Sequence, residues 1–494
     1  MNYISTRGHF EGVSSAYAIK KGLAPDGGLY MPDELPKFTH EDFESICKMD
    51  YAERAAFILG RYLTDYTHEE LLADCKEAYS NARFGDSPAP IHALNDNIRI
   101  LELWHGPTCA FKDMALQIMP RLLSRALVKT GEERTAFILV ATSGDTGKAA
   151  LEGYRDAKQT KIMVFYPVDG VSRIQKLQMA TQEGENVEVR AVVGNFDDTQ
   201  SGVKRIFSDT AAAKKLSDNG FILSSANSIN WGRLAPQIVY YISAYCDLVN
   251  RGDIKIGDEM NVCVPTGNFG NILAAYIAKN CGLPVGRLIC ASNKNNILTD
   301  FFKTGVYDRN RDFYTTMSPS MDILISSNLE RLLFMSAGEI DTAAYMKSLS
   351  DKGRYEITPG LRESFAEQFS GMYCDENATA ERIKATFDEY SYLIDTHTAV
   401  GLDCATRYIE ETGDKRPMLT VSTASPYKFA SSVLKALTGE VSADEFENLT
   451  ALSSLTKTEI PYPLASLKGK KIRFNPDSPI EAAEMENEVF SAIL

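Results

Sequence analysis

Several features that mark other protein classes are scarce in this sequence of 494 residues. Its nine cysteines form no CxxC pair, it has only six histidines, and no apolar run reaches the roughly 18–20 residues of a membrane-spanning helix. These absences argue against a disulfide framework, a metal site and a membrane anchor. Positive charge is also in deficit, since 52 Lys and Arg face 66 Asp and Glu for a net charge of −14. Nucleic acid and anionic membranes are therefore poor partners, and any bound anion must be held locally.

The bulk properties that remain are those of an ordinary globular chain. Hydrophobic residues make up 44% of the sequence, and its length predicts two or three domains. The first residues do not follow the pattern of a basic start and an apolar stretch that marks a targeting segment. We therefore expect a soluble, cytoplasmic protein with reduced thiols.

One stretch, LELWHGPTCAFKDMALQ at residues 101–117, places a lysine between a sharp turn and a helix start. His105 to Pro107 form the turn, and Phe111 sets an aromatic wall beside Lys112. A lysine held partly out of water loses some of its preference for charge, which frees its amine to attack carbonyls and to carry protons. We therefore expect Lys112 to be the reactive group, although an ordinary surface lysine at a helix start is the simpler alternative.

Two glycine-rich turns follow runs of β-branched residues, one within residues 135–154 and the other within 260–279. In each, glycines let the backbone approach a ligand, and the amides of the next helix point at it with the positive end of the helix dipole. Such turns bind anions. The spacing excludes the common nucleotide motifs, because Thr142 and Ala149 break the Walker pattern and Pro265 replaces the leading glycine of the dinucleotide fingerprint. What remains is a small anionic cofactor and an anionic substrate.

Taken together, these segments resemble a known family. HGPTCAFKDMALQ, TSGDTGKAA, PTGNFGN and STASPYKF, with the leading YISTRG and GLAPDGGLYMP, are similar to threonine synthases, pyridoxal-phosphate enzymes of the tryptophan-synthase-like fold type II. The resemblance covers most of the chain. Dehydratases and cysteine synthases carry similar glycine loops, and the leading segments distinguish threonine synthases from them.

The resemblance implies where the cofactor is held. Lys112 would bind pyridoxal 5'-phosphate covalently, and the hydroxyl of Thr423 would face the pyridine nitrogen. The cofactor phosphate would lie on the backbone amides of the loop around Gly270, namely those of Gly267, Asn268, Phe269 and Asn271.

The substrate would lie against other loops. Its carboxylate is expected at Thr142, Ser143, Asp145 and Thr146, although an acidic side chain there is unfavourable unless it is protonated or turned away. Its phosphate is expected at Asn195, Lys204 and Asn227, with weaker candidates at Arg173 and Lys176, and Arg7 is expected near the substrate pocket. The alternative for these residues is helix capping or a solvated surface. His397 opens a helix, as a cap with a satisfied ring or as an active-site group.

The predicted fold class is α/β, a fold type II pyridoxal-phosphate enzyme with parallel sheets covered by helices on both faces. NIRILEL, TAFILVAT, KIMVFYP, NVEVRAVVG and PMLTVST are the expected strands. We expect an N-terminal domain at 1–95, a catalytic core at 96–440 and a packing segment without chemistry at 441–494. Within the core, a small subdomain would span about 113–240 and a helical insertion about 296–395.

The resemblance implies conversion of O-phospho-L-homoserine and water to L-threonine and phosphate, through γ-elimination and β-addition of water, as the last step of threonine biosynthesis. A phospho-lyase or a serine/threonine dehydratase is the alternative enzyme. A non-catalytic binding module would be expected to have a damaged lysine turn or glycine loop, and neither is seen. The expected partner is the small-molecule substrate, with no nucleic acid, no membrane and no metal, in a monomer or homodimer.

Overall fold

Two parallel sheets lie at the centre of the computed structural model, which describes residues 1–8, 11–169, 171–194 and 196–493. The larger sheet has six strands, all parallel except its last edge strand. In spatial order they are β13 (Phe369–Tyr373), β10 (Val285–Ser292), β9 (Met260–Pro265), β14 (Met418–Ser422), β4 (Ile98–Glu102) and β3 (Ile91–Ala93). The central strands β9 and β14 are buried throughout, as expected where helices cover both faces.

The smaller sheet has four parallel strands. In spatial order they are β7 (Val187–Val192), β6 (Thr160–Pro167), β5 (Thr135–Ala141) and β8 (Phe221–Ser224). Its helices are α7 (Met119–Lys129), α8 (Asp145–Tyr154), α9 (Arg173–Ala180), α10 (Phe196–Ser208) and α11 (Thr210–Asp218). The five strands predicted from the sequence are therefore confirmed.

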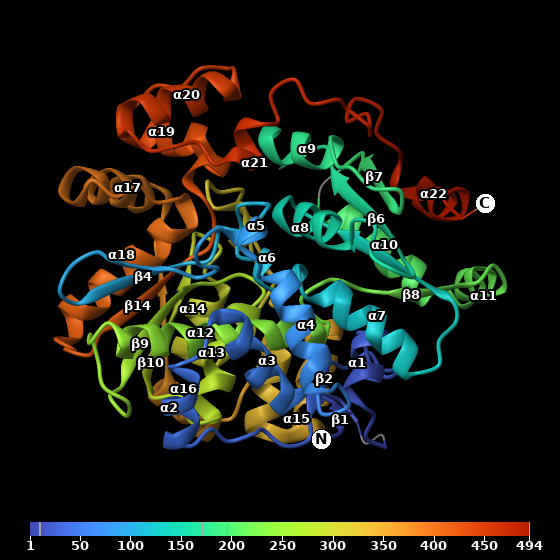
Figure 1. Ribbon diagram of the computed structural model, residues 1–494, viewed down its shortest axis with the longest axis horizontal. Coiled ribbons are helices and arrows are strands. Elements are labelled where there is room, and N and C mark those ends of the chain that lie inside the picture. Colours follow the sequence, from blue (N-terminus) through green and yellow to red (C-terminus); the bar gives the residue numbers. More distant parts are fainter. Residues whose placement is uncertain (9–10, 170, 195, 494) are drawn as a thin grey trace.

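The long helices of the remaining chain surround the larger sheet (Figure 1). They are α12 (Trp231–Asn250), α13 (Gly270–Asn280), α14 (Ile297–Thr304), α15 (Leu329–Lys352), α16 (Pro359–Gln368), α17 (Glu376–Tyr390) and α18 (Thr396–Thr412). Helix α12 packs against α13, and the expected bounds of the small subdomain, about 113–240, stay a prediction. The expected helical insertion also contributes a strand, because β13 pairs with β10 at the edge of the sheet.

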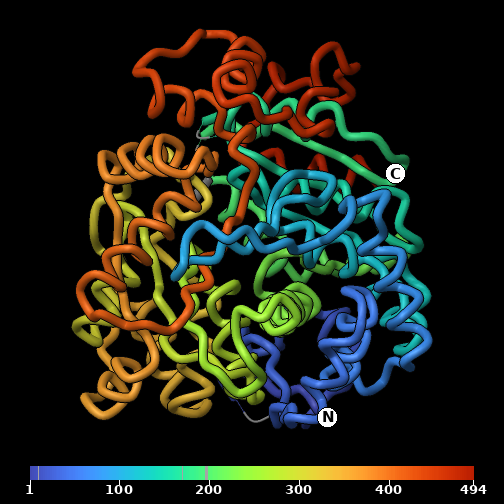
Figure 2. The backbone as a smooth tube through the Cα atoms, turned by 60° about the vertical axis from the view of Figure 1, so that its left-hand side comes forward, coloured from blue at the N-terminus to red at the C-terminus, as the bar shows by residue number. Residues whose placement is uncertain are grey.

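The N-terminal region packs beside the core rather than forming a separate body (Figure 2). It contains β1 (Tyr3–Ser5), α1 (Ser15–Lys21), β2 (Tyr30–Pro32), α2 (His40–Ile46), α3 (Tyr51–Tyr62), α4 (His68–Ala78) and α5 (Asn81–Phe84). Tyr3 and Tyr62 pack against Trp231 of α12, with ring centroids 5.5 and 5.9 Å apart. These contacts join the region to the same hydrophobic core.

The C-terminal segment crosses the molecule from the larger sheet to the smaller one (Figure 1). It contains η2 (Pro426–Phe429), α19 (Ala430–Thr438), α20 (Glu445–Thr456), α21 (Tyr462–Ala465), η3 (Ala482–Glu484) and α22 (Met485–Ser491). At its far end Ile480 forms a parallel bridge with Val192 of β7, and Arg190 contacts Glu488 at 2.5 Å. The segment therefore adds an edge to the smaller sheet.

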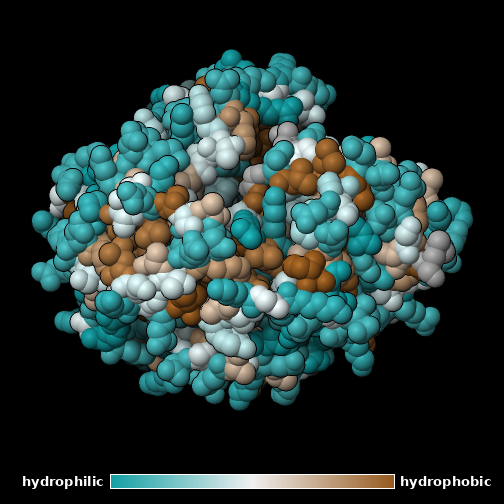
Figure 3. Space-filling model, turned by 90° about the horizontal axis from the view of Figure 1, so that it is seen from above, coloured by the Kyte–Doolittle hydropathy of each residue, from teal (hydrophilic) through white to brown (hydrophobic). Residues whose placement is uncertain are grey.

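The surface seen from above is mostly hydrophilic, with apolar patches across its middle (Figure 3).

Two short antiparallel strand pairs complete the fold, β1 with β2 and β11 (Val306–Asp308) with β12 (Arg354–Glu356). Within the described residues, no helix is long and apolar enough to span a bilayer.

Helix α8 crosses α6 (Asp113–Leu116) at a point where only glycine fits. A Cβ on Gly153 would lie 1.9 Å from the Leu116 carbonyl oxygen. Because α6 follows Lys112 and α8 begins at Asp145, this close crossing sets how the two helix starts face each other.

We expect Gly153→Ala to lower the free energy of unfolding by about 3 kcal/mol, since the added methyl overlaps backbone that cannot swing away. Gly360→Ala is the matched control, because nothing lies within 4 Å of the added Cβ in α16. That change should raise stability by about 0.5–1 kcal/mol through helix propensity and lost chain entropy. Urea unfolding measures both, and equal effects of the two substitutions would contradict the crossing.

Candidate active site

Lys112 lies at the carboxyl edge of the larger sheet, directly before α6. The preceding turn is fixed by backbone contacts, since Phe111 N donates to the Thr423 carbonyl at 2.8 Å and Ala110 pairs with Ala424 after β14. Gly106 is required in the turn because a Cβ there would lie 2.5 Å from Asp113 Oδ2. The structure therefore brings Thr423 beside the lysine turn, as the sequence predicted.

Asp113 holds this turn from within α6. Its carboxylate accepts hydrogen bonds from Thr108 N at 2.8 Å and from Thr108 Oγ1 at 2.7 Å. Burial raises the pKa of Asp113 to about 6, although these hydrogen bonds favour the charged form. The turn that precedes Lys112 is thus stabilised from both of its ends.

The Lys112 amine is buried beside the Phe111 ring and the Asp145 carboxylate. Its Nζ lies 4.6 Å from the centre of the Phe111 ring and 3.6 Å from Asp145 Oδ2. Burial lowers the pKa of Lys112 to about 8; Asp145 opposes this effect, whereas the charges of Arg233 and Lys428 add to it. At neutral pH a useful fraction of the amine is therefore uncharged, which a nucleophile and proton carrier requires. The expected aromatic wall is confirmed.

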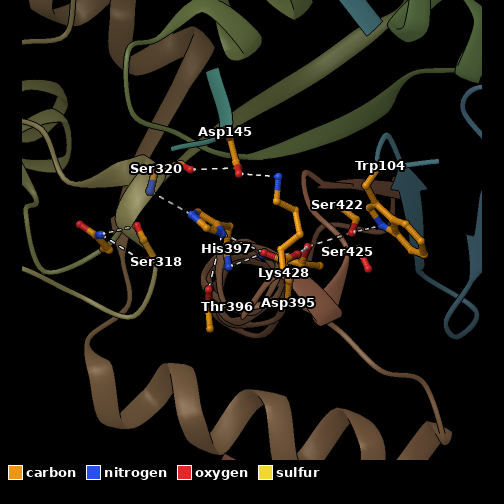
Figure 4. Close-up of polar contacts among 12 residues, drawn as sticks. Trp104, Asp145, Ser318, Ser320, Asp395, Thr396, His397, Ser422, Ser425 and Lys428 are labelled. Atoms are coloured by element: carbon orange, nitrogen blue, oxygen red, sulfur yellow. Dashed lines mark hydrogen bonds and ion pairs between the residues drawn. The ribbon is translucent and has the colours of Figure 1, made fainter. Parts of the chain in front are cut away.

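Asp145 is the first residue of α8 and lies between Lys112 and Lys428, of which Figure 4 shows Lys428. Its Oδ1 accepts from Lys428 Nζ at 2.7 Å and from Gln175 Nε2 at 2.8 Å. Burial alone would raise the pKa of Asp145, but Lys428, Lys112 and Gln175 together hold it well below its usual range. A buried cation, Lys428, therefore neutralises this carboxylate in place, and the part of Asp145 in substrate binding stays open.

Lys428 was part of a quoted motif but was not identified as a site residue. Its side chain is fully buried in η2, and its Nζ also donates to the Thr108 carbonyl at 3.0 Å. The sequence gives no direct signal for this pairing, because 283 positions separate Asp145 from Lys428 and only the fold brings them together.

The loop at residues 267–271 connects β9 to α13. Phe269 has φ 61° in the left-handed region and is the N-cap of α13. Ser326 Oγ donates to the Gly267 carbonyl at 2.8 Å, and Asn328 N donates to the Asn268 carbonyl at 3.1 Å. Within the described residues, no loop carbonyl or side chain accepts from the amides of these five residues. The loop is thus braced through its carbonyls while its amides stay available.

Asn271 adds a buried donor to this loop. Its Oδ1 accepts from Tyr240 OH at 2.5 Å and from Tyr241 OH at 2.6 Å, which fixes the orientation of the amide. Its Nδ2 is buried and has no hydrogen-bond partner in the described chain. A buried donor without an acceptor is costly, so this loop suits an anion that supplies one.

A loop from the helical insertion covers the site and joins the two sheets (Figure 4). Ser320 N donates to His397 Nε2 at 3.1 Å, and Ser320 Oγ lies 3.4 Å from Asp145 Oδ2. His397 Nδ1 contacts Asp395 Oδ1 at 2.9 Å, and Asp395 is the N-cap of α18. Of the two readings of His397, the structure favours the satisfied ring, while the capping role belongs to Asp395.

The loop at residues 142–146 is stabilised by its own first residue. Thr142 Oγ1 accepts from Gly144 N at 3.0 Å and from Gly147 N at 2.9 Å, so this hydroxyl is engaged within the loop. Ser143 and Thr146 are half-buried at the start of α8. Their positions leave them as the loop's available hydroxyls, and carboxylate binding here stays a prediction.

The predicted phosphate residues are only partly brought together. Asn195 lies outside the described residues. Lys204 is exposed on α10, where its Nζ donates to Gln200 Oε1 at 3.0 Å. Asn227 lies in the half-buried turn before α12, while the neighbouring Asn230 is the residue that caps the helix. The roles of all three in substrate binding stay predictions.

The weaker phosphate candidates and Arg7 have local partners. Lys176 Nζ donates to the Val168 carbonyl at 2.5 Å, and Arg173 is exposed at the start of α9. Arg7 forms a two-point ion pair with Glu330, at 2.8 and 2.7 Å. The structural reading of Arg7 is therefore favoured.

Arg233 is a buried arginine that was not among the residues predicted for the site. Its NH1 donates to the Ala226 carbonyl at 2.8 Å, and the described residues offer its guanidinium no carboxylate partner. Burial lowers its pKa to about 10, and its charge reaches Lys112. A buried guanidinium without a counter-ion is expected where an anionic ligand supplies one. The signal available in the sequence was the arginine within the turn NSINWGR.

Three family models match consecutive parts of the chain. The model described as Threonine synthase N terminus matches residues 2–79, and the Pyridoxal-phosphate dependent enzyme model matches 82–424. The model described as Threonine synthase, C-terminal matches residues 398–475. The chain belongs to the threonine synthase family. Its cofactor is pyridoxal phosphate, and its fold is that of the type II enzymes predicted from the sequence.

Individual relatives agree with this placement. A protein of Pseudomonas aeruginosa named Threonine synthase is 38% identical, over 90% of this chain and 92% of its own. The PLP-bound threonine synthase structure from Brucella melitensis has a TM-score of 0.87 at 35% identity, covering 100% of this chain and 99% of that one. A human protein named Threonine synthase-like 1 is 42% identical over 85% of this chain. The matched part covers 57% of the length of that relative.

The residues present fit the family's cofactor. The unengaged amides at 267–271 and the unpartnered Asn271 Nδ2 suit its phosphate, and the buried Lys112 amine suits its aldehyde. Within the described chain no group of three or more His, Cys, Asp or Glu is placed to hold a metal ion.

We expect Gly267→Ala to weaken pyridoxal-phosphate binding by about tenfold or more. The new Cβ would lie 2.7 Å from the Ser320 carbonyl oxygen, so the phosphate loop must move away from the covering segment. Titration of the cofactor-free protein with the coenzyme, followed by absorbance, measures the change. The midpoint of urea unfolding serves as the control for stability. A variant that loses stability but keeps its cofactor affinity would contradict the proposal that this loop holds the cofactor phosphate.

Proposed function

We propose that this protein converts O-phospho-L-homoserine and water to L-threonine and phosphate. The observation that carries the proposal is the buried Lys112 amine between two anion-binding features, the loop at 267–271 and the Arg233 guanidinium. Lys112, Lys428 and Arg233 outnumber the carboxylates of Asp145 and Asp113 beside them, in a chain whose net charge is −14. Such a local reversal of charge favours a substrate that carries two acidic groups.

The roles of the side chains follow from their positions. Bound pyridoxal phosphate supplies an electron sink for the carbanions formed next to the substrate nitrogen. Lys112 tethers it and, once released, takes the proton from the substrate's α carbon and exchanges a proton at its β carbon. The hydroxyl of Thr423 would hold the ring nitrogen of the bound coenzyme as a neutral partner. Ser143 and Thr146 hold the substrate carboxylate with the amides that begin α8.

Arg233 is proposed to hold the substrate's phosphate, together with Asn227 in the adjacent turn. A planar guanidinium pairs with phosphate through two parallel hydrogen bonds, and it stays charged throughout the reaction. The leaving phosphate is thereby stabilised as it departs from the γ carbon. Water then adds at the β carbon.

Product analysis tests the proposal against its alternative. Purified protein loaded with pyridoxal phosphate is incubated with O-phospho-L-homoserine, and amino acids, 2-oxo acids and phosphate are quantified. We expect threonine and phosphate in equal amounts. Formation of 2-oxobutyrate and ammonia without threonine would instead identify a lyase or dehydratase, a comparison made necessary by the 42% identity to proteins named Threonine synthase-like 1.

The proposal extends to the protein's setting. We infer a cytoplasmic enzyme of small molecules, a monomer or a homodimer, with no nucleic-acid or membrane partner. The strongly negative net charge supports the absence of polyanionic partners.

A further inference from the structure

Lys428 is a fully buried charge to which the proposed reaction assigns no task. Its ammonium lies 2.7 Å from Asp145 Oδ1 and 3.0 Å from the Thr108 carbonyl oxygen. Burying an ammonium is expensive unless it is paired and hydrogen-bonded. An apolar side chain could fill this position without that cost, so packing alone does not explain a lysine here.

The contacts of Lys428 join three parts of the site (Figure 4). Lys428 itself lies in η2, five residues after Thr423, which directly follows β14. Thr108 belongs to the turn before Lys112, and Asp145 starts α8 on the smaller sheet. The ammonium therefore links both sheets at the point where the reactive amine lies.

Asp145 is shared unequally between the two lysines. Its Oδ1 makes the short contact with Lys428, whereas its Oδ2 lies 3.6 Å from Lys112 Nζ, beyond ordinary hydrogen-bond length. Gln175 Nε2 holds the Oδ1 side at 2.8 Å, and Ser320 Oγ faces Oδ2 at 3.4 Å. The carboxylate is thus anchored on the side away from the amine.

We propose that Lys428 is a positioning residue that competes with Lys112 for the Asp145 carboxylate and so keeps the Lys112 amine free to react. Without Lys428, the anchored oxygen loses its cation, and the carboxylate is drawn to Lys112 as its remaining nearby cation. Lys112 is then held as a paired ammonium. The inference rests on the proposed function only in taking Lys112 as the reacting amine.

The other charged groups near Lys112 do not take the place of Lys428 as the partner of Asp145. Arg233 from α12 adds positive charge, but it is not paired with Asp145. Asp113 in α6 is engaged by Thr108, and Cys109 is buried with a raised pKa. The balance at the amine therefore depends on Asp145 and Lys428 as a pair.

The test follows the pH dependence of cofactor attachment to the full-length protein. The neutral Lys112 amine adds to the aldehyde carbon of pyridoxal phosphate and the carbonyl oxygen leaves as water, so the attachment rate reports the fraction of neutral amine. Attachment is measured by borohydride reduction and mass spectrometry of the Lys112 peptide. This readout needs no turnover of substrate.

We expect Lys428→Met to raise the midpoint of the rate–pH profile by about one unit, which slows attachment about tenfold at pH 7. Asp145→Asn should lower the midpoint by a similar amount, because Lys112 then faces two cations and no carboxylate. The double variant should return close to the wild-type midpoint. Opposite shifts that cancel are the signature of a charge balance, since a purely structural pair would give losses of the same sign.

Lys148→Met is the matched control. Lys148 is also a buried lysine, on the same helix α8, but it pairs with Glu152 at 3.3 Å and not with Asp145. It should lose stability without moving the midpoint. If Lys428→Met does not fold, Asp145→Asn and the double variant carry the same comparison.

The proposal is overturned if Lys428→Met and Asp145→Asn shift the midpoint in the same direction, or not at all, or if the double variant keeps either single shift. A normal threonine yield with unshifted midpoints would reject the role of Lys428 while leaving the proposed function intact. The expected midpoint shifts without threonine formation would reject the proposed function while supporting the role of Lys428.

Discussion

Replacing Lys112 with alanine is expected to abolish covalent attachment of pyridoxal phosphate and to lower threonine formation by about a thousandfold or more. The variant loses both the tether and the group that moves protons at the α and β carbons, and positioned proton transfer alone contributes roughly 10²–10⁴-fold. Fold and stability should change little, because the buried amine makes no hydrogen bond shorter than its 3.6 Å contact with Asp145.

Lys112→Arg is the companion variant, because it keeps a positive charge beside Asp145 but has no nucleophilic amine. Both variants should still bind the coenzyme reversibly through the loop at 267–271. Absorbance spectra and product assays check the result. Substantial turnover by either variant would show that another group carries the chemistry.

Replacing Arg233 with methionine is expected to lower kcat/KM for O-phospho-L-homoserine by roughly 10- to 100-fold, the range for lost hydrogen bonds to a charged group. The inhibition constant of inorganic phosphate should rise in parallel. Cofactor affinity should stay near the wild-type value, because the coenzyme phosphate is proposed to bind at the separate loop, residues 267–271. Arg233→Lys should recover only part of the loss, since an ammonium lacks the planar two-point geometry.

Arg331→Met provides the matched control for Arg233. Arg331 is also a fully buried arginine, but its donors are satisfied by the Tyr30 and Ile229 carbonyls and by Asn328 Oδ1. Its loss should weaken the fold, as measured by urea, without changing phosphate inhibition. If Arg233→Met changed stability alone, Arg233 would be a structural residue and the phosphate would be held elsewhere.

The features set by local chemistry were predictable from the sequence. The strands follow β-branched and aromatic runs that end in glycine or polar residues, as at Ala141 and Pro265. The two anion turns follow from glycines placed between a strand and a helix, and Phe111 follows from its position beside Lys112. The family resemblance added the cofactor and the choice of loop for its phosphate.

The features set by long-range contacts were not predictable. Asp145 looked unfavourable because its counter-ion, Lys428, lies 283 positions away and only the packing of the two sheets joins them. His397 could not be assigned because its partner is the backbone amide of Ser320, on a loop of the helical insertion. Arg233 gained its importance because the described residues offer it no carboxylate partner, which no sequence pattern reveals.

Peptide mapping after borohydride reduction tests the central claim most directly. The purified protein is loaded with pyridoxal phosphate, reduced, digested and examined by mass spectrometry. One phosphopyridoxyl group per chain is expected, on the peptide that contains Lys112. Labelling of a different lysine, or no stable label at any pH around 8, would contradict the assignment of the reactive amine.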